Sequence, residues 1–134
     1  MIAFIEHPVR HDDAGFLKLY RPGHGVETLS SNWATCAGLA WHPLRNEIWF
    51  TAASGGASRS LWALSISGKL RPVLQVPGPL TLRDISRVGK LLISRDARRL
   101  EMSGSIGGKP ERNFSWLDWS RVQQLSEDGG LLLF

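Results

Sequence analysis

Three segments of the chain repeat one pattern, and this repeat constrains the fold more than any other feature. Each is a polar turn followed by an apolar stretch. HPLRNEIWF begins at His42, SRVGKLLIS at Ser86 and SEDGGLLLF at Ser126, so successive copies start 44 and 40 residues apart. At the start of the chain, Ile2–Phe4 matches Ile48–Phe50 at a spacing of 46 residues. Self-similarity at a fixed period indicates a chain built of stacked structural units.

Four short apolar stretches fill one repeat unit, from about residue 37 to residue 76. They are AGLAW, NEIWFTA, SLWALSI and LRPVLQV, and turns at HPLRN, SGGAS and SGK separate them, as hairpin-connected strands require. Units of about 40–45 residues with four strands are typical of β-propeller blades. We therefore predict an all-β fold, a partial β-propeller with about three blades of four-stranded antiparallel sheets.

The repeat divides the chain into four predicted segments. Residues 1–33 form a blade lacking its first strand, 34–78 and 79–116 form full blades, and 117–134 form a truncated blade. In the last segment, the stretch LDWSRVQQLSE also has a helical spacing of Leu117, Val122 and Leu125. Its place in the repeat favours a strand over that helix.

Composition places the chain among globular proteins, because 43% of its 134 residues are apolar and 21% are charged. The net charge of +4 is scattered, apart from Arg95, Arg98 and Arg99, which favours a solvated basic surface over a nucleic-acid partner. Cys36 is the only cysteine, so the sequence predicts neither an internal disulfide nor a zinc site.

No targeting or membrane segment is recognised in the sequence. The N-terminal stretch MIAFIEHPVR has no positively charged start, and its apolar run ends at Glu6, unlike a signal peptide. No stretch approaches the roughly 18 apolar residues that span a bilayer. The sequence as written predicts a cytoplasmic chain, while a longer parent protein is free to be membrane-anchored.

The turn-and-strand units resemble the WD-repeat-like blades of TolB-type propellers. They are most similar to the propeller region that many bacterial serine/threonine protein kinases, notably from acidobacteria, carry C-terminally. The similarity is carried by IAFIEHPVRHDDAG, GLAWHPLRNEIWFTA, LTLRDISRVGKLLISRD and RNFSWLDWS, which cover most of the chain. It implies a propeller fold in a fragment that lacks the kinase domain.

The three copies of the turn differ from the family's SPDGK sequence, and two of them differ most. HPLRN lacks the Asp-Gly pair, SRVGK has Val88 in place of Asp, and SEDGG has Gly130 in place of Lys. Asp-Gly suits a tight hairpin because both residues tolerate positive φ, so its loss predicts loosened hairpins in an intact fold. The kinase motifs, a Gly-rich loop, HRD and DFG, are missing, and kinase activity is therefore possible only in a longer parent protein.

The densest polar cluster is EHPVRHDD, with His7, His11, Asp12 and Asp13. Histidines four residues apart bind zinc on a helix, but Pro8 and the preceding apolar strand favour a solvated turn. No GxSxG elbow is present, and SGGAS lacks the lysine and helix of a phosphate-binding loop. We therefore predict no catalytic residue, no metal site and no cofactor.

The six tryptophans predict a core between blades, with a stacking surface for a peptide or sugar as the alternative. The repeat places the blade core on the first and second strands of each unit, so Trp41, Trp49 and Ile85 should be largely buried. Propellers line their channel with the innermost strands, and a few polar residues lie on or beside these predicted strands. The candidate ligand residues on this channel face are Arg83, Asp84, Asp118 and Trp119.

Three functions stay open from the sequence. The first is a non-catalytic recognition or scaffolding module with a protein or peptide partner, as part of the sensor or interaction region of a larger kinase-like protein. The second is a remnant of a propeller that gated a kinase or peptidase domain, and the third is a small metal-dependent hydrolase. The blades that lack strands also predict self-association through open edges.

Overall fold

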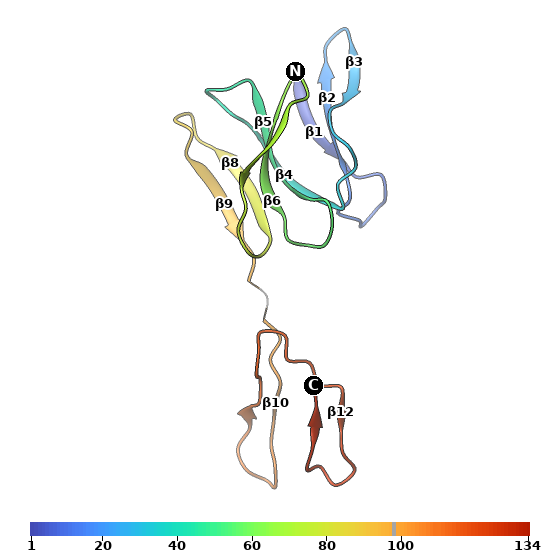
Figure 1. Cartoon of the computed structure of the whole chain (residues 1–134), viewed down its shortest axis with the longest axis vertical. Helices are drawn as coiled ribbons and strands as arrows, with labels where there is room; N and C mark the ends of the chain where they lie inside the picture. The colour runs from blue at the N-terminus through green and yellow to red at the C-terminus, as the bar shows by residue number, and fades with distance from the viewer. Residues whose placement is uncertain (98) are drawn as a thin grey trace. The chain divides into compact units, whose positions relative to one another are not determined.

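Every regular element of the protein is a β-strand (Figure 1). The computed structural model describes residues 1–97 and 99–134. These residues contain no helix, including the stretch 117–127 whose spacing allowed one, so the all-β prediction is confirmed. The strands fall into two units, Met1–Asp96 and Ala97–Phe134, and each unit is described by itself.

The first unit contains three antiparallel sheets. The first sheet has the order β1 (Ile2–Glu6), β2 (Phe16–Arg21) and β3 (Gly25–Thr28). The second is a four-stranded meander of β4 (Thr35–Trp41), β5 (Glu47–Ala53), β6 (Ser60–Ser65) and β7 (Leu70–Leu74). The third pairs β8 (Leu80–Ile85) with β9 (Leu91–Arg95). The four apolar stretches recognised between residues 37 and 76 are therefore the strands of one sheet.

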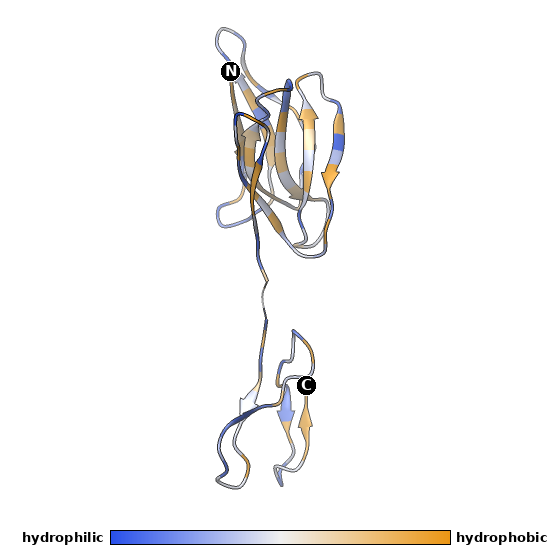
Figure 2. Cartoon of the chain, turned by 90° about the vertical axis from the view of Figure 1, so that its left-hand side faces the viewer, coloured by the Kyte–Doolittle hydropathy of each residue, from blue (hydrophilic) through white to orange (hydrophobic). Residues whose placement is uncertain are grey.

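Alternate residues of β5 enter two different hydrophobic cores, because neighbouring side chains of a strand point to opposite faces. One core contains Leu17, Trp33, Cys36, Ile48, Phe50, Ala52 and Leu64. The other contains Trp49, Leu61, Ala63, Leu82 and Ile85. A strand buried on both faces needs a continuous apolar run, which β5 has. Figure 2 shows that hydrophobic residues concentrate on the strands of this unit, while the turns are mostly hydrophilic.

The burial predictions hold for two of the three residues. Trp49 and Ile85 are each 8% exposed, as predicted. Trp41 is only half-buried, although it packs against the first core. It is the last residue of β4, where the strand gives way to an exposed turn, so less of the neighbouring sheet covers it.

Strands β4 and β8 approach each other at backbone distance. Gly38 interrupts the register of β4 and has a φ of 69°, and a Cβ on it would lie 2.1 Å from the carbonyl oxygen of Leu82. Only glycine combines that conformation with so close a neighbour. The Thr51 hydroxyl donates to the carbonyl of Ala37 and accepts the N–H of Leu82 at 3.3 Å. A side chain of β5 thus satisfies backbone groups of both strands.

The repeated turns share a serine that closes the hairpin. In each, the serine hydroxyl accepts a backbone N–H from across the turn: Ser65 from Lys69 at 2.9 Å, Ser86 from Lys90 at 3.0 Å and Ser126 from Leu131 at 2.9 Å. The HPLRN turn uses His42 instead, whose Nδ1 accepts the N–H of Leu44 at 3.2 Å. Two hairpins without Asp-Gly are therefore closed by side chains whose role the sequence comparison did not recognise.

The second unit has short strands and few buried residues. It pairs β10 (Ser103–Gly104) with β11 (Arg112–Asn113), and β12 (Gln124–Leu125) with β13 (Leu132–Leu133). The four strands expected over residues 79–116 thus pair as β8–β9 in the first unit and β10–β11 in the second. Among the described residues of this unit, only Met102 and Ser120 are buried.

Candidate functional site

Two of the four predicted channel residues, Arg83 and Asp84, are neighbours in β8 and both are exposed. The pairing with β9 shifts register between Leu82 and Asp84, which makes Arg83 the extra residue of a β-bulge. Arg83 Nε donates to the Ser94 hydroxyl at 3.0 Å, and the Asp84 carboxylate accepts the N–H of Ile85 at 2.7 Å. The bulge therefore presents a cation and an anion to solvent at adjacent positions.

The other two, Asp118 and Trp119, belong to the second unit. The Asp118 carboxylate lies 3.8 Å from Arg99 Nε. Trp119 is 65% exposed and Trp116 is 80% exposed, so two exposed indole rings flank this carboxylate in place of the predicted core. The four candidate residues form two pairs, one within each unit.

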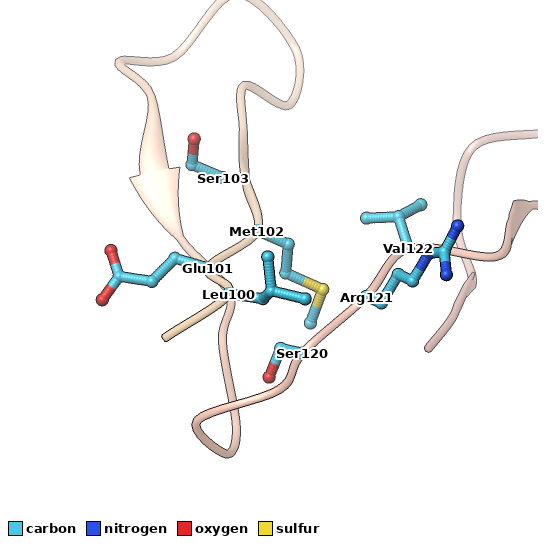
Figure 3. A pocket seen from close by; sticks show the side chains of 7 residues that line it. All are labelled: Leu100, Glu101, Met102, Ser103, Ser120, Arg121 and Val122. Carbon is cyan, nitrogen blue, oxygen red and sulfur yellow. The ribbon is translucent and has the colours of Figure 1, made fainter. Parts of the chain in front are cut away.

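A shallow hollow of about 490 Å³ lies in the second unit (Figure 3). Its lining residues are Leu100, Glu101, Met102, Ser103, Ser120, Arg121 and Val122. The Ser120 hydroxyl accepts the N–H groups of Trp116 and Leu117 at 2.9 and 3.1 Å and donates to the Leu117 carbonyl at 2.9 Å. This hydroxyl shapes a turn, and no histidine lines the hollow to activate it.

The polar cluster EHPVRHDD begins at Glu6, the last residue of β1, and continues into the loop between β1 and β2, as the solvated-turn interpretation predicts. His7 Nδ1 lies 3.0 Å from the carbonyl oxygen of Ala14, and Asp12 accepts the N–H of Ala14 at 2.9 Å. Across residues 1–97 and 99–134, no group of three or more His, Cys, Asp or Glu side chains is placed to hold one metal ion. The cluster therefore supplies turn bonds in the described chain.

Arg59 makes a hydrogen-bond network that was not predicted from the sequence. Its Nε donates to the Leu80 carbonyl at 3.1 Å, Nη1 to the Thr35 hydroxyl at 3.0 Å and Nη2 to the Thr81 hydroxyl at 3.1 Å. Nη1 also lies 3.9 Å from the Asp13 carboxylate. One guanidinium from the glycine-rich loop between β5 and β6 thus bonds to strands of the second and third sheets and lies near the loop that joins β1 to β2. The SGGASR sequence indicated only a hairpin connection.

A second unrecognised cluster surrounds Trp49, beside the turn between β4 and β5. Arg71 donates to the Glu47 carboxylate at 2.7 and 3.3 Å, and Trp49 Nε1 donates to the same carboxylate at 3.0 Å. The hydrogen bond from Arg71 holds the pKa of Glu47 below its ordinary value of 4.5. The His42 ring lies 4.7 Å from the Trp49 ring, and the Arg71 guanidinium lies 5.8 Å from it.

No protein-family model, no curated protein and no solved structure matches the chain. In the described residues, no helix has the length and the apolar character that crossing a membrane would require.

Proposed function

We propose that the chain is a non-catalytic recognition or scaffolding module built of propeller-type blades. The observation that carries this proposal is the β4-β5-β6-β7 meander with a hydrophobic core on each face. Propeller blades are four-stranded sheets of this kind, arranged around a central axis. The close approach of Gly38 to Leu82 supports the same arrangement, because it brings together the first strands of two successive sheets.

The hydrogen bonds made by the polar side chains support the non-catalytic part of the proposal. Ser120 and Asp12 bond to turn backbone, while Arg59 and Glu47 bond to groups of neighbouring strands. A nucleophile needs a base within hydrogen-bond reach. The hollow lined by Ser120 contains no histidine, and its one carboxylate, Glu101, is paired with Arg99 Nε at 3.0 Å. These groups stabilise the fold, which leaves the exposed surfaces for recognition.

The resemblance to kinase-linked propellers supports a sensor or interaction region as the wider context. A propeller that gates a kinase or peptidase domain is the alternative for the same blades. The coding DNA on either side of this chain separates the two from an independent module. An adjoining open frame with HRD and DFG motifs supports the kinase-linked proposal, and one with a peptidase nucleophile supports the gating alternative.

A peptide-display selection tests the recognition proposal without assuming a ligand. The immobilised chain should enrich peptides with a shared motif from a random library, and the enriched peptides should bind the folded chain but not the urea-unfolded chain. Titration calorimetry should meanwhile detect no ATP–magnesium binding, because the chain lacks a phosphate-cradling residue set. No enriched motif, or ATP binding in the micromolar range, would contradict the proposal.

A further inference from the structure

Three turns of the first unit lie at one end of its sheets. In a meander, the turn after the first strand and the turn after the third lie at the same end, so the β4–β5 and β6–β7 turns are together. The β8–β9 turn lies beside them, since a Cβ on Gly89 would be 3.9 Å from Leu44 and 4.0 Å from His42. Figure 1 shows the β4–β5 and β8–β9 turns at the upper end of this unit.

Each of these three turns carries exposed basic side chains. They are Arg45 on the first turn, Lys69 on the second, and Arg87 and Lys90 on the third. We call this set the basic end. In the part of the chain that the structure describes, none of the four belongs to an ion pair.

The acidic residues of the first unit neutralise the basic end only in part. Glu27 is held by Arg21 at 2.6 Å and Glu47 by Arg71 at 2.7 Å. The hydrogen bond from Arg71 is the main cause of the lowered pKa of Glu47, and the charge of Arg45 contributes to it. Asp84 is the remaining carboxylate near these turns, and it accepts the N–H of Ile85. The other carboxylates of this unit lie toward the opposite ends of the strands: Glu6, Asp12, Asp13 and Asp96. The basic end therefore has an excess of positive charge.

We propose that the basic end binds an acidic, extended segment of a partner protein, an inference that rests on the recognition function proposed above. In a sheet, a strand and its second neighbour are about 10 Å apart, so the β6–β7 turn is about 10 Å from the β4–β5 turn. The β8–β9 turn is closer, because Gly89 lies against Leu44 and His42 of the β4–β5 turn. An extended chain covers about 10 Å in about three residues. A segment with Asp or Glu at every third position would therefore place carboxylates opposite successive turns.

An acidic peptide fits this surface better than a nucleic acid does. Single-stranded nucleic acids are held by exposed aromatic rings that stack on the bases. Two tryptophans lie beside the β4–β5 turn. Trp49 is 8% exposed and lies against His42 and Arg71, and Trp41 is half-buried and packs against the first core. The surface therefore offers charge without a stacking platform.

Fluorescence anisotropy of a labelled peptide tests the proposal. The probe is a peptide of about twelve residues with Glu at every third position, and the competitor is an oligothymidine of similar charge. The full chain should bind the peptide more tightly than the oligothymidine, and binding should weaken as salt rises. Tighter binding of the oligothymidine would overturn the proposal in favour of a nucleic-acid surface.

Charge-reversal pairs locate the site. Arg87→Glu with Lys90→Glu, and separately Arg45→Glu with Lys69→Glu, should each weaken peptide binding about tenfold, which corresponds to about 1.4 kcal/mol. The control pair is Arg10→Glu with Arg95→Glu, which makes the same change in net charge at exposed positions toward the opposite end. Equal weakening by the control pair would show non-specific attraction and overturn the proposal.

The outcomes also separate this inference from the function on which it rests. If display selects peptides that bind but the basic-end pairs do not affect them, recognition stands and the basic end is not its site. If no peptide of any kind binds the folded chain, both proposals are contradicted. Thermal melting of each variant tests whether the exposed substitutions leave the fold intact. Because two independent pairs probe the basic end, one pair still tests the proposal if the other pair unfolds the chain.

Discussion

Trp33 and Trp49 have nearly the same burial but different polar surroundings. They are 5% and 8% exposed, yet Trp33 Nε1 has no hydrogen-bond partner among the described residues, whereas Trp49 Nε1 donates to Glu47 at 3.0 Å. A buried donor without a partner costs about 1–3 kcal/mol. The indole nitrogen therefore opposes folding at one position and supports it at the other.

This difference predicts that Trp33→Phe is less destabilising than Trp49→Phe, by about 1–2 kcal/mol. Both substitutions remove the same volume, so their cavity costs are comparable. Urea unfolding followed by far-ultraviolet circular dichroism measures both. Equal costs would mean that a bound water satisfies Trp33 in solution, and the opposite order would contradict the prediction.

Cys36 predicts a second residue-scale result. The thiol is 1% exposed, and burial raises its pKa from 9.0 to about 12. Because alkylation needs an accessible thiolate, iodoacetamide at about pH 8 should label the folded chain only as fast as it opens. The same shift predicts that stability falls as pH rises from 9 toward 12, since the unfolded thiol ionises first. Fast labelling that urea does not accelerate would contradict the buried position.

The strands differ in how well their positions could be predicted from the sequence. The four strands from β4 to β7 were predictable, because alternation and turn residues marked each one, and β5 had the continuous run of a strand buried on both faces. The bulges at Gly38 and Arg83 were not predictable, because they depend on the approach of β4 to β8. The serines that close the turns could have been recognised, because Ser86 and Ser126 occupy the same position in two successive repeats. The comparison with an Asp-Gly turn did not take this serine into account.

The turn between β8 and β9 predicts that Ser86→Ala destabilises the first unit by about 0.5–1.5 kcal/mol, the usual contribution of one hydrogen bond. The substitution removes the acceptor of the Lys90 N–H. Val88→Ala in the same turn is the matched control, because Val88 is 72% exposed and should be nearly neutral. Thermal unfolding compares the two. Equal melting temperatures would mean that the glycine alone, with a φ of 81° at Gly89, determines this turn.

At the scale of the whole molecule, the sequence indicated which types of residue belong to the candidate site, but it did not indicate which of them lie together in space. Arg83 and Asp84 are exposed neighbours in β8, but their partners in the predicted channel face, Asp118 and Trp119, belong to the other unit. The networks of Arg59 and Glu47 join residues more than twenty positions apart. Such contacts depend on which strands become neighbours, and no local pattern encodes that.

The second unit predicts self-association of the chain, because most of its large apolar side chains are exposed. They include Leu100, Ile106, Trp116, Leu117, Trp119, Val122, Leu125, Leu131, Leu133 and Phe134. Exposed apolar surface of this extent favours association. Light scattering coupled to size exclusion should give a mass above the 14.9 kDa of one chain. Trp116→Ser with Trp119→Ser should lower that mass, whereas the control Leu44→Ser with Val88→Ser should not. A monodisperse single chain would contradict the prediction.

The Arg59 network has a consequence for folding kinetics. Its hydrogen bonds reach Thr35 of β4 and Thr81 of β8, and it lies near Asp13 of the loop between β1 and β2, so these contacts form only after distant segments have come together. Contacts of that kind are expected to be absent from the folding transition state. Arg59→Lys, which cannot reproduce the planar fork of donors, should therefore speed unfolding and leave the folding rate nearly unchanged. In stopped-flow experiments, only the unfolding arm of the plot of rate against denaturant concentration should move. A residue of the loop that connects β5 to β6 then controls how long the assembled sheets persist before they unfold.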